Sequence, residues 1–189
     1  MTRQDGPRIN EEHLRQGSPA NVTFQETFPR YLCGTDNAIS ATGVCHATAV
    51  ALQAGDVVTN ITFVTGATAA VTPTAGFVAL YSSAATPALL AQSADFGSTA
   101  RAANTAFTVA LATAQVITVP GIYYVVISFT AGTIPTLRGI SVGNAVVAGA
   151  IATSSKVLAQ SHGAAVGAVA PATIATPTTV ATPVYYVLT

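Results

Sequence analysis

The recurrence of short apolar runs between turn signals constrains the fold of this 189-residue chain more than any other feature. From residue 45 onward, segments rich in β-branched and aromatic residues follow one another at intervals typical of a β-sandwich, and no segment has the pattern of a long amphipathic helix. The predicted strands are 45–52, 57–65, 77–82, 88–93, 106–111, 116–119, 122–130, 137–142 and 184–188. Together they predict an all-β fold, a jelly-roll-like antiparallel β-sandwich.

Alternating apolar and polar residues predict which side chains of the second strand face the core. Val57, Ile61 and Phe63 are expected on one face. Asn60 and Thr62 are expected on the other face. One side of this strand should therefore pack against the opposite sheet.

Two later strands also have patterns that predict their places in the sandwich. Strand 106–111 alternates cleanly, so we expect Phe107, Val109 and Leu111 to point inward and the residues between them to point outward. Strand 122–130 is the most hydrophobic and is apolar on both faces, which predicts a central position in its sheet.

The chain changes character near residue 45. Residues 1–44 are polar and rich in turn signals, and they hold too few apolar residues to form a core alone. We predict that they form an extended N-terminal arm that packs on the main body or on a neighbouring subunit, with a short helical turn at 10–16. Residues 45–189 are predicted to form the β-sandwich domain.

Within that domain, residues 143–183 form a long Ala/Thr/Pro-rich excursion before the last strand. Pro171, Pro177 and Pro183 prevent a continuous helix or a central strand across its second half. Its apolar content is too high for a typical disordered segment. We therefore expect a long irregular segment that lies on the sandwich or against a neighbouring subunit.

The charges of the chain are few as well as balanced. Seven basic and seven acidic residues cancel, which gives no electrostatic attraction to nucleic acid or to anionic lipid. Ten of the fourteen precede Val57, and only Asp95, Arg101, Arg138 and Lys156 follow it. Such a surface is either buried in an assembly or kept soluble by Thr and Ser hydroxyls. We favour the assembly and expect a homo-oligomer, most simply three copies around an axis.

No segment predicts targeting to a membrane or insertion into one. Residues 1–17 are polar and charged, whereas a signal peptide contains an apolar stretch. The apolar runs 142–152 and 164–175 are interrupted and too short to span a bilayer. We expect a protein that is soluble when made or that leaves its cell without a Sec signal.

Cys33 and Cys45 are the only cysteines, and their spacing leaves open whether they form a disulfide. Because no signal peptide is visible, we expect free thiols. Zinc binding needs more ligands at closer spacing than these two cysteines and three scattered histidines provide.

The sequence offers no set of residues for catalysis, for a cofactor or for a metal, so we assign none and expect a protein that is not an enzyme. His46 and His162 are expected in turn or surface positions, and the serine next to His162 in sequence does not make a catalytic triad. Asp56 is expected in a turn, and Asp95 is expected to form an ion pair with Arg101.

Six tyrosines raise the alternative of a carbohydrate site, because exposed tyrosine rings can stack on sugars. They lie within strand patterns, so packing in the core or between subunits is the favoured role. The six are Tyr31, Tyr81, Tyr123, Tyr124, Tyr185 and Tyr186.

Several short segments occur in an order that resembles a known group of proteins. They are 26–32 (ETFPRYL), 37–40 (NAIS), 59–64 (TNITFV), 77–82 (FVALYS), 89–95 (LLAQSAD), 121–125 (GIYYV) and 134–137 (IPTL). With these segments, residues 24–189 resemble β-sandwich virion structural proteins, of the minor tail or decoration type, from tailed bacteriophages that infect actinobacteria. None of the segments is a catalytic motif, so the resemblance carries over no functional residue.

The resemblance implies a non-enzymatic structural protein of a bacteriophage virion, of the minor tail or head-decoration type. It implies contacts with copies of itself and with other virion proteins, and adhesion to a host cell-surface glycan as a further role. The protein would then be assembled in the host cytoplasm and located in the virion. The alternative from another functional class is a carbohydrate-binding β-sandwich module.

Overall fold

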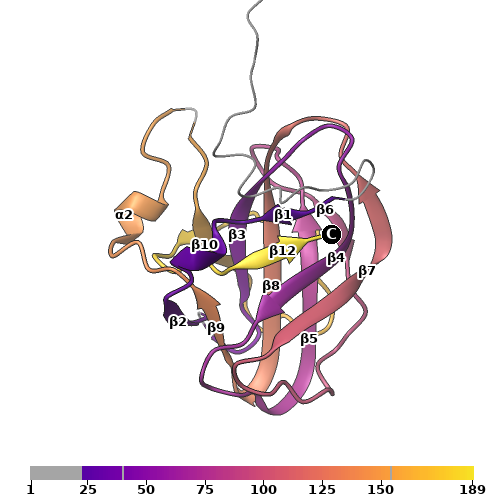
Figure 1. The fold of residues 1–189 in the computed structure, drawn as a ribbon, viewed down its shortest axis with the longest axis vertical. Helices are drawn as coiled ribbons and strands as arrows, with labels where there is room; N and C mark the ends of the chain where they lie inside the picture. The colour runs from indigo at the N-terminus through magenta and orange to yellow at the C-terminus, as the bar shows by residue number, and fades with distance from the viewer. Residues whose placement is uncertain (1–22, 40, 154) are drawn as a thin grey trace, which may run out of the picture.

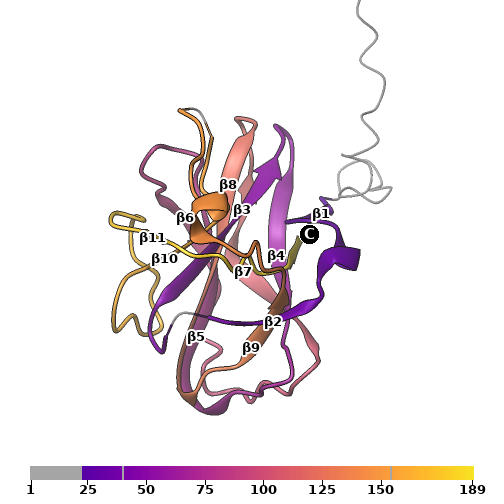
Figure 2. The same ribbon diagram turned by 90° about the vertical axis from the view of Figure 1, so that its left-hand side faces the viewer.

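Two antiparallel β-sheets pack face to face in this chain, and a third, small sheet lies beside them (Figure 1, Figure 2). The structure is a computed structural model, and it describes residues 23–39, 41–153 and 155–189. The all-β antiparallel sandwich predicted from the sequence is confirmed.

Strand order defines the three sheets. The four-stranded sheet has the order β1 (Gln25–Glu26), β12 (Tyr186–Leu188), β4 (Val57–Val64) and β7 (Ala106–Val116). The six-stranded sheet has the order β11 (Thr178–Thr179), β10 (Ala159–His162), β3 (Cys45–Leu52), β8 (Gly121–Thr133), β5 (Val71–Tyr81) and β6 (Leu89–Gln92). The small sheet pairs β2 (Thr35–Ala38) with β9 (Thr136–Gly139), and two short helices are η1 (Arg30–Leu32) and α2 (Ala145–Ala148).

The chain crosses repeatedly between the two large sheets. β3, β5, β6 and β8 belong to the six-stranded sheet, whereas β4 and β7 belong to the four-stranded sheet. β4 pairs with β7 while β5 pairs with β8, so the two hydrogen-bonded pairs lie in opposite layers. These crossings join the layers covalently at several points and hold the core between them.

Several predicted strands have different bounds in the structure. Segment 77–82 is the second half of the longer β5, and segment 137–142 begins and ends earlier, as β9. The separate strand predicted at 116–119 was wrong, because β7 itself continues to Val116. After it, the Ile117 N–H donates to the Asp56 carbonyl oxygen at 2.8 Å, which closes the turn between β3 and β4.

The predicted face of Val57 was also wrong, because a β-bulge interrupts the alternation of β4. The pairing of β4 with β7 shifts register between Val58 and Asn60, so Val58 is fully buried and Val57 only partly. The backbone N–H groups of Thr59 and Asn60 both donate to the carbonyl oxygen of Thr189, which satisfies the bulge. Beyond the bulge, Ile61 is buried as predicted, and so is Phe63.

Aromatic rings from both sheets form the centre of the core between the layers. The centroid of the Phe63 ring lies 6.0 Å from that of Phe129 and 5.7 Å from that of Phe107. Phe96 packs against Phe129 at 5.6 Å. The inward direction predicted for Phe107, Val109 and Leu111 is confirmed, although Phe107 and Val109 are only partly buried because β7 is an edge strand.

β8 has the central position predicted for segment 122–130, with β3 on one side and β5 on the other. Its inner face contributes Val125 and Ile127 to the core between the sheets. Its outer face contributes Tyr124 and Val126 to a second, separate core. Both faces of the six-stranded sheet are therefore covered.

The excursion supplies the cover of that outer face. Ala170 and Ile174 are buried against Phe77 and Tyr81 of β5. The segment therefore packs on the sandwich, which is one of the two positions predicted for it. The expectation of a wholly irregular segment was wrong at β10, which pairs with β3 and extends the sheet. β10 has only four residues, too few for a clear alternation pattern.

The described part of the predicted arm contributes two strands. β1 pairs with β12, and β2 pairs with β9. Between them, the buried Glu26 carboxylate accepts hydrogen bonds from Arg30 Nε at 2.7 Å and from the Tyr185 hydroxyl at 2.6 Å. Residues 23–39 therefore pack on the main body, as one of the alternatives for the arm proposed. The helical turn predicted at 10–16 lies outside the described residues.

Candidate functional site

Every charged side chain after residue 57 has a partner within the chain. Arg138 forms an ion pair with Asp36, with 2.8 Å between Nη1 and Oδ1. The Lys156 ammonium donates to the carbonyl oxygens of Ser83 at 3.0 Å and Ala84 at 3.1 Å. Asp95 and Arg101 also have partners within the chain, but they do not pair with each other.

The ion pair predicted between Asp95 and Arg101 was wrong. Oδ1 of Asp95 accepts from the backbone N–H groups of Gly76 at 2.9 Å and Gly97 at 2.8 Å, so this carboxylate orders the loop after β6. The Arg101 guanidinium lies 4.8 Å from the ring centroids of Phe96 and Phe107. Burial lowers the pKa of the Arg101 guanidinium, and a cation–π contact replaces the predicted ion pair.

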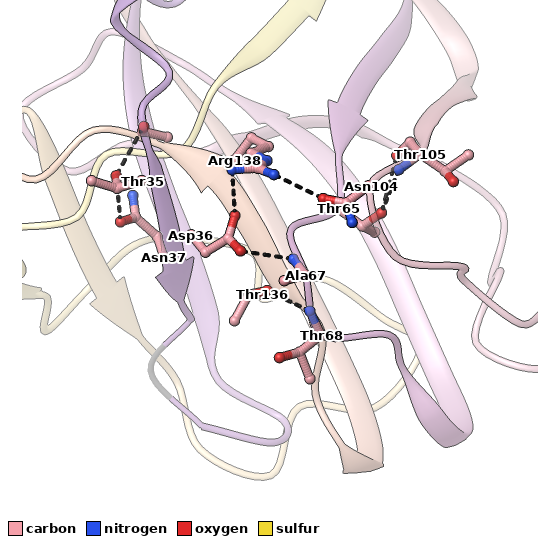
Figure 3. A network of polar contacts seen from close by, with 11 residues as sticks. Thr35, Asp36, Asn37, Thr65, Ala67, Thr68, Asn104, Thr105, Thr136 and Arg138 are labelled. Carbon is pink, nitrogen blue, oxygen red and sulfur yellow. Dashed lines mark hydrogen bonds and ion pairs between the residues drawn. The ribbon is translucent and has the colours of Figure 1, made fainter.

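A polar network joins the small sheet to the loops at one end of the sandwich (Figure 3). Asp36 Oδ2 accepts from the Ala67 N–H at 2.8 Å, while Arg138 Nη2 donates to the side-chain oxygen of Asn104 at 2.8 Å. The Thr136 hydroxyl accepts from the Thr68 N–H at 3.0 Å. Each partner is a backbone amide or a neighbouring side chain of the fold.

The same network explains why glycine occupies position 66. A Cβ atom there would lie 2.5 Å from Thr136 Oγ1 and 2.6 Å from Asp36 Oδ1, so a side chain would displace the network. Since the acceptors and donors of Asp36 and Arg138 satisfy one another, this cluster positions loops and offers no free group for chemistry.

The two histidines predicted at turn or surface positions are instead buried. His46 Nε2 donates to the Thr182 carbonyl oxygen at 2.8 Å, and its Nδ1 has no partner. The His162 ring packs edge-on against Tyr81, with 5.9 Å between centroids. Burial lowers the pKa of each histidine to about 4, so both are neutral near pH 7. The prediction failed because both lie in strands that pair inside the sheet.

The two cysteines do not form a disulfide, as predicted. Cys45 is buried in the outer core, and burial raises the pKa of its thiol to about 12. Burial also raises the pKa of the Cys33 thiol to about 11. Both thiols therefore stay protonated near neutral pH and are poor nucleophiles.

Five of the six tyrosines are buried, which confirms packing as their role within the fold. Tyr81 donates from its hydroxyl to the Pro171 carbonyl oxygen at 2.6 Å, and Tyr124 donates to that of Val157 at 3.0 Å. Tyr31 differs, because it is 76% exposed on η1. A platform of stacked tyrosines for sugars is therefore absent from the described residues.

A pocket of about 300 Å³ lies on the outer face of the six-stranded sheet. Its floor includes Tyr124, and Pro87, Ile174 and Pro177 contribute apolar walls. Lys156 also lines it, together with polar groups of β10. Sequence reasoning missed this pocket, because its walls come from separate loops that only the excursion brings together.

An exposed apolar projection surrounds α2, at the side of the sandwich in Figure 1. Val146 is 73% exposed and Ile151 is 74% exposed, with Val147 and Leu158 also exposed. Ala148 anchors the projection, because it is buried and its carbonyl oxygen accepts from the Leu158 N–H. The sequence signal for it is a run of Ala and Val without a single charge.

The described residues contain no group of three or more His, Cys, Asp or Glu side chains that could hold a metal ion. Nor is any described helix both long and apolar enough to cross a membrane. No protein-family model matches the chain, and no curated protein matches its sequence. The resemblance to phage virion proteins thus stays an expectation.

Proposed function

We propose that the protein is a non-enzymatic structural component of a bacteriophage virion, of the minor tail or head-decoration type. It would act through contacts with copies of itself and with other virion proteins, after assembly in the host cytoplasm. The resemblance of residues 24–189 supports the proposal, and so does the chemistry of the surface.

The observation that carries the proposal is the small number of charges on the described surface, four of them after residue 57. Asp95, Arg101, Arg138 and Lys156 are all held by intramolecular partners. A surface with so few charges provides little electrostatic repulsion between copies, so apolar and hydroxyl groups can come together at low cost. Such contacts would also change little with salt.

The projection around α2 is the surface we assign to contacts with a second copy. Four of the eleven large hydrophobic side chains exposed among the described residues lie within 146–158. Clustering of this kind is typical of interfaces, whereas single exposed apolar residues are ordinary. An assembly of three copies remains our expectation, with more than about 1,000 Å² buried per pair of subunits.

Substitution on this projection tests the proposal. Ile151→Asp places a charge at a site outside any strand or helix, so the sandwich should stay folded. We expect sedimentation velocity to show oligomers for the native chain and a shift toward monomers for Ile151→Asp. Val119→Asp is the matched control, since Val119 is 60% exposed in the loop before β8. Equal assembly of the two variants would contradict the assignment of the interface.

Deletion of the first residues tests the role of the arm. Because β1 begins at Gln25, the deletion must stop at residue 22 to leave the four-stranded sheet complete. These 22 residues carry six of the fourteen charges of the chain. We expect the shortened protein to keep its β-sheet circular dichroism and melting temperature while assembling more weakly. If the shortened protein assembled as well as the full-length chain, the arm would not be part of the interface.

A second candidate function is a carbohydrate-binding module, and the pocket on the outer face is the observation that favours it. Its volume of about 300 Å³ is at the lower end of small-molecule sites. Tyr-to-Ala variants test it poorly, since five tyrosines stabilise the cores. A glycan array probed with the native chain and with pocket variants is the appropriate screen.

A further inference from the structure

The pocket on the outer face contains a buried polar group that the fold leaves unused. Gln160 of β10 is only 3% exposed, and its side chain lines the pocket. Within the described part of the chain, its amide makes no hydrogen bond to any other group. Its cross-strand partners are Ala47 of the outer core and Thr179 of β11. Because the side chain lines the pocket, its amide can donate a hydrogen bond to a ligand there and accept one from it.

Lys156 supplies the only charge at this pocket. Its ammonium donates to the carbonyl oxygens of Ser83 and Ala84, which fix its position at the wall. An ammonium group has three N–H donors, so one remains for a ligand. No carboxylate lines the pocket, so nothing there neutralises the charge.

The remaining walls combine apolar side chains with the hydroxyl groups of Thr86 and Ser155. Tyr124 forms part of the floor and is held by its hydrogen bond to Val157, while Ile174 is fixed in the outer core. Pro87 and Pro177 complete these walls. A ligand therefore meets one cation, one amide that can both donate and accept, and a surface suited to C–H groups.

We propose that this pocket binds an acidic monosaccharide unit of a glycan, with a uronic acid as the simplest case. The carboxylate of the sugar accepts a hydrogen bond from Lys156 Nζ. Two adjacent hydroxyls match the Gln160 amide, one donating to its oxygen and the other accepting from its nitrogen. The C–H face of the pyranose ring packs on the proline and isoleucine walls, and a volume of about 300 Å³ suits one such ring.

The inference rests on the second candidate function and specifies its ligand. The pocket and the assembly surface are adjacent, because Ser155, Lys156 and Val157 line the pocket, but α2 and Ile151 do not. Loss of sugar binding with intact oligomers would leave the structural proposal standing. Loss of assembly in Ile151→Asp with intact sugar binding would separate the two functions.

Three small probes test the ligand chemistry by isothermal titration calorimetry on the full chain. Methyl α-galacturonide carries both the carboxylate and the diol, methyl α-galactoside carries only the diol, and acetate carries only the carboxylate. We expect the uronide to bind with a Kd of about 1 mM, which is reasonable for a ligand of this size. The neutral glycoside and acetate should each bind at least about tenfold more weakly.

Variants of the two polar residues test the site itself. Gln160→Leu keeps the size of the side chain but removes the amide, and Lys156→Met keeps most of the stem but removes the charge. Each should weaken uronide binding by about tenfold or more. Gln115→Leu is the matched control, because Gln115 lies on β7 in the other sheet, and its binding should be unchanged.

The melting temperature of every variant is measured alongside its binding. If Gln160→Leu fails to fold, Lys156→Met decides, since its side chain lies at the wall of the pocket and is not fully buried. The proposal is overturned if the uronide does not bind, or if acetate or the neutral glycoside binds as well as the uronide. Native affinity in both folded pocket variants would overturn it as well.

Discussion

The two faces of the six-stranded sheet are both buried, but by different kinds of structure. The inner face packs against a second sheet, with side chains such as Ile127 and Phe129 meeting those of β4 and β7. The outer face is covered by a segment with little regular structure, in which Ala170 and Ile174 fill the places of core residues. One strand, β8, serves both cores through alternate residues.

The difference lies in how each cover is held. Pairing along whole strands and interlocked aromatic rings hold the inner face. The outer cover is held by separate hydrogen bonds, such as those from the Tyr81 hydroxyl to Pro171 and from the Ala170 N–H to Gln92. Regions with fewer cooperative contacts open at lower free energy. We therefore expect the outer cover to detach locally before the sandwich unfolds.

Loss of a ring from the inner core should have the largest effect. Phe129 is fully buried and contacts the rings of Phe63 and Phe96. Phe129→Ala removes those contacts and leaves a cavity, which should lower the free energy of unfolding by about 3–5 kcal/mol. Phe107→Ala should cost less, because Phe107 is only partly buried on the edge strand β7. Urea denaturation measures both, and equal losses would contradict the described register.

Acid should weaken the packing on both faces of the six-stranded sheet, because one buried histidine lies on each face. His46 pairs with Ile127 of the inner core, and His162 pairs with Cys45 of the outer core. Each folded-state pKa is lowered to about 4, below the ordinary value near 6.5, so the unfolded chain binds protons first as the pH falls. Stability is therefore complete above pH 6.5 and declines from there toward pH 4. Each histidine should contribute up to about 2 kcal/mol of loss between pH 6.5 and pH 5.

Denaturant curves recorded at several pH values provide the measurement. His46→Gln should make the free energy of unfolding depend less on pH, because the contribution of the inner-face histidine is lost. An unchanged dependence on pH in that variant would contradict a neutral, buried His46.

Removal of the Gln92 side chain should have a smaller and more local effect. Its amide accepts from the Ala170 N–H at 2.8 Å and donates to the Ala168 carbonyl oxygen at 3.2 Å. Gln92→Ala should cost about 1–3 kcal/mol in local opening, because both partners lose their bonds. Hydrogen exchange should accelerate across 163–177 while β8 stays protected.

Gln53→Ala is the control for that experiment, because its exposed side chain lies in the turn between β3 and β4. Faster exchange across β8 in Gln92→Ala would show that the two faces unfold together.

The sequence predicted the inner layer well and the outer layer poorly. Alternation identified the inward face of β7, and a run that is apolar on both faces identified β8 as the central strand. Alternation failed at Val57, where a bulge shifts the register, and at the short strand β10, where four residues carry no pattern. His46 and Arg101 were misplaced because their partners, Thr182 and the two phenylalanine rings, are distant in sequence. The pocket depends on four separate segments meeting and has no local signal.

The molar mass of the purified full-length chain in solution tests the central claim most directly. Light scattering across a wide range of concentration, at low and at high salt, measures whether a 19.0 kDa subunit associates. We predict the mass of three subunits, with little change on adding salt because the described surface carries few charges. A stable 19.0 kDa monomer at every concentration and salt would contradict self-assembly and favour the carbohydrate-binding module.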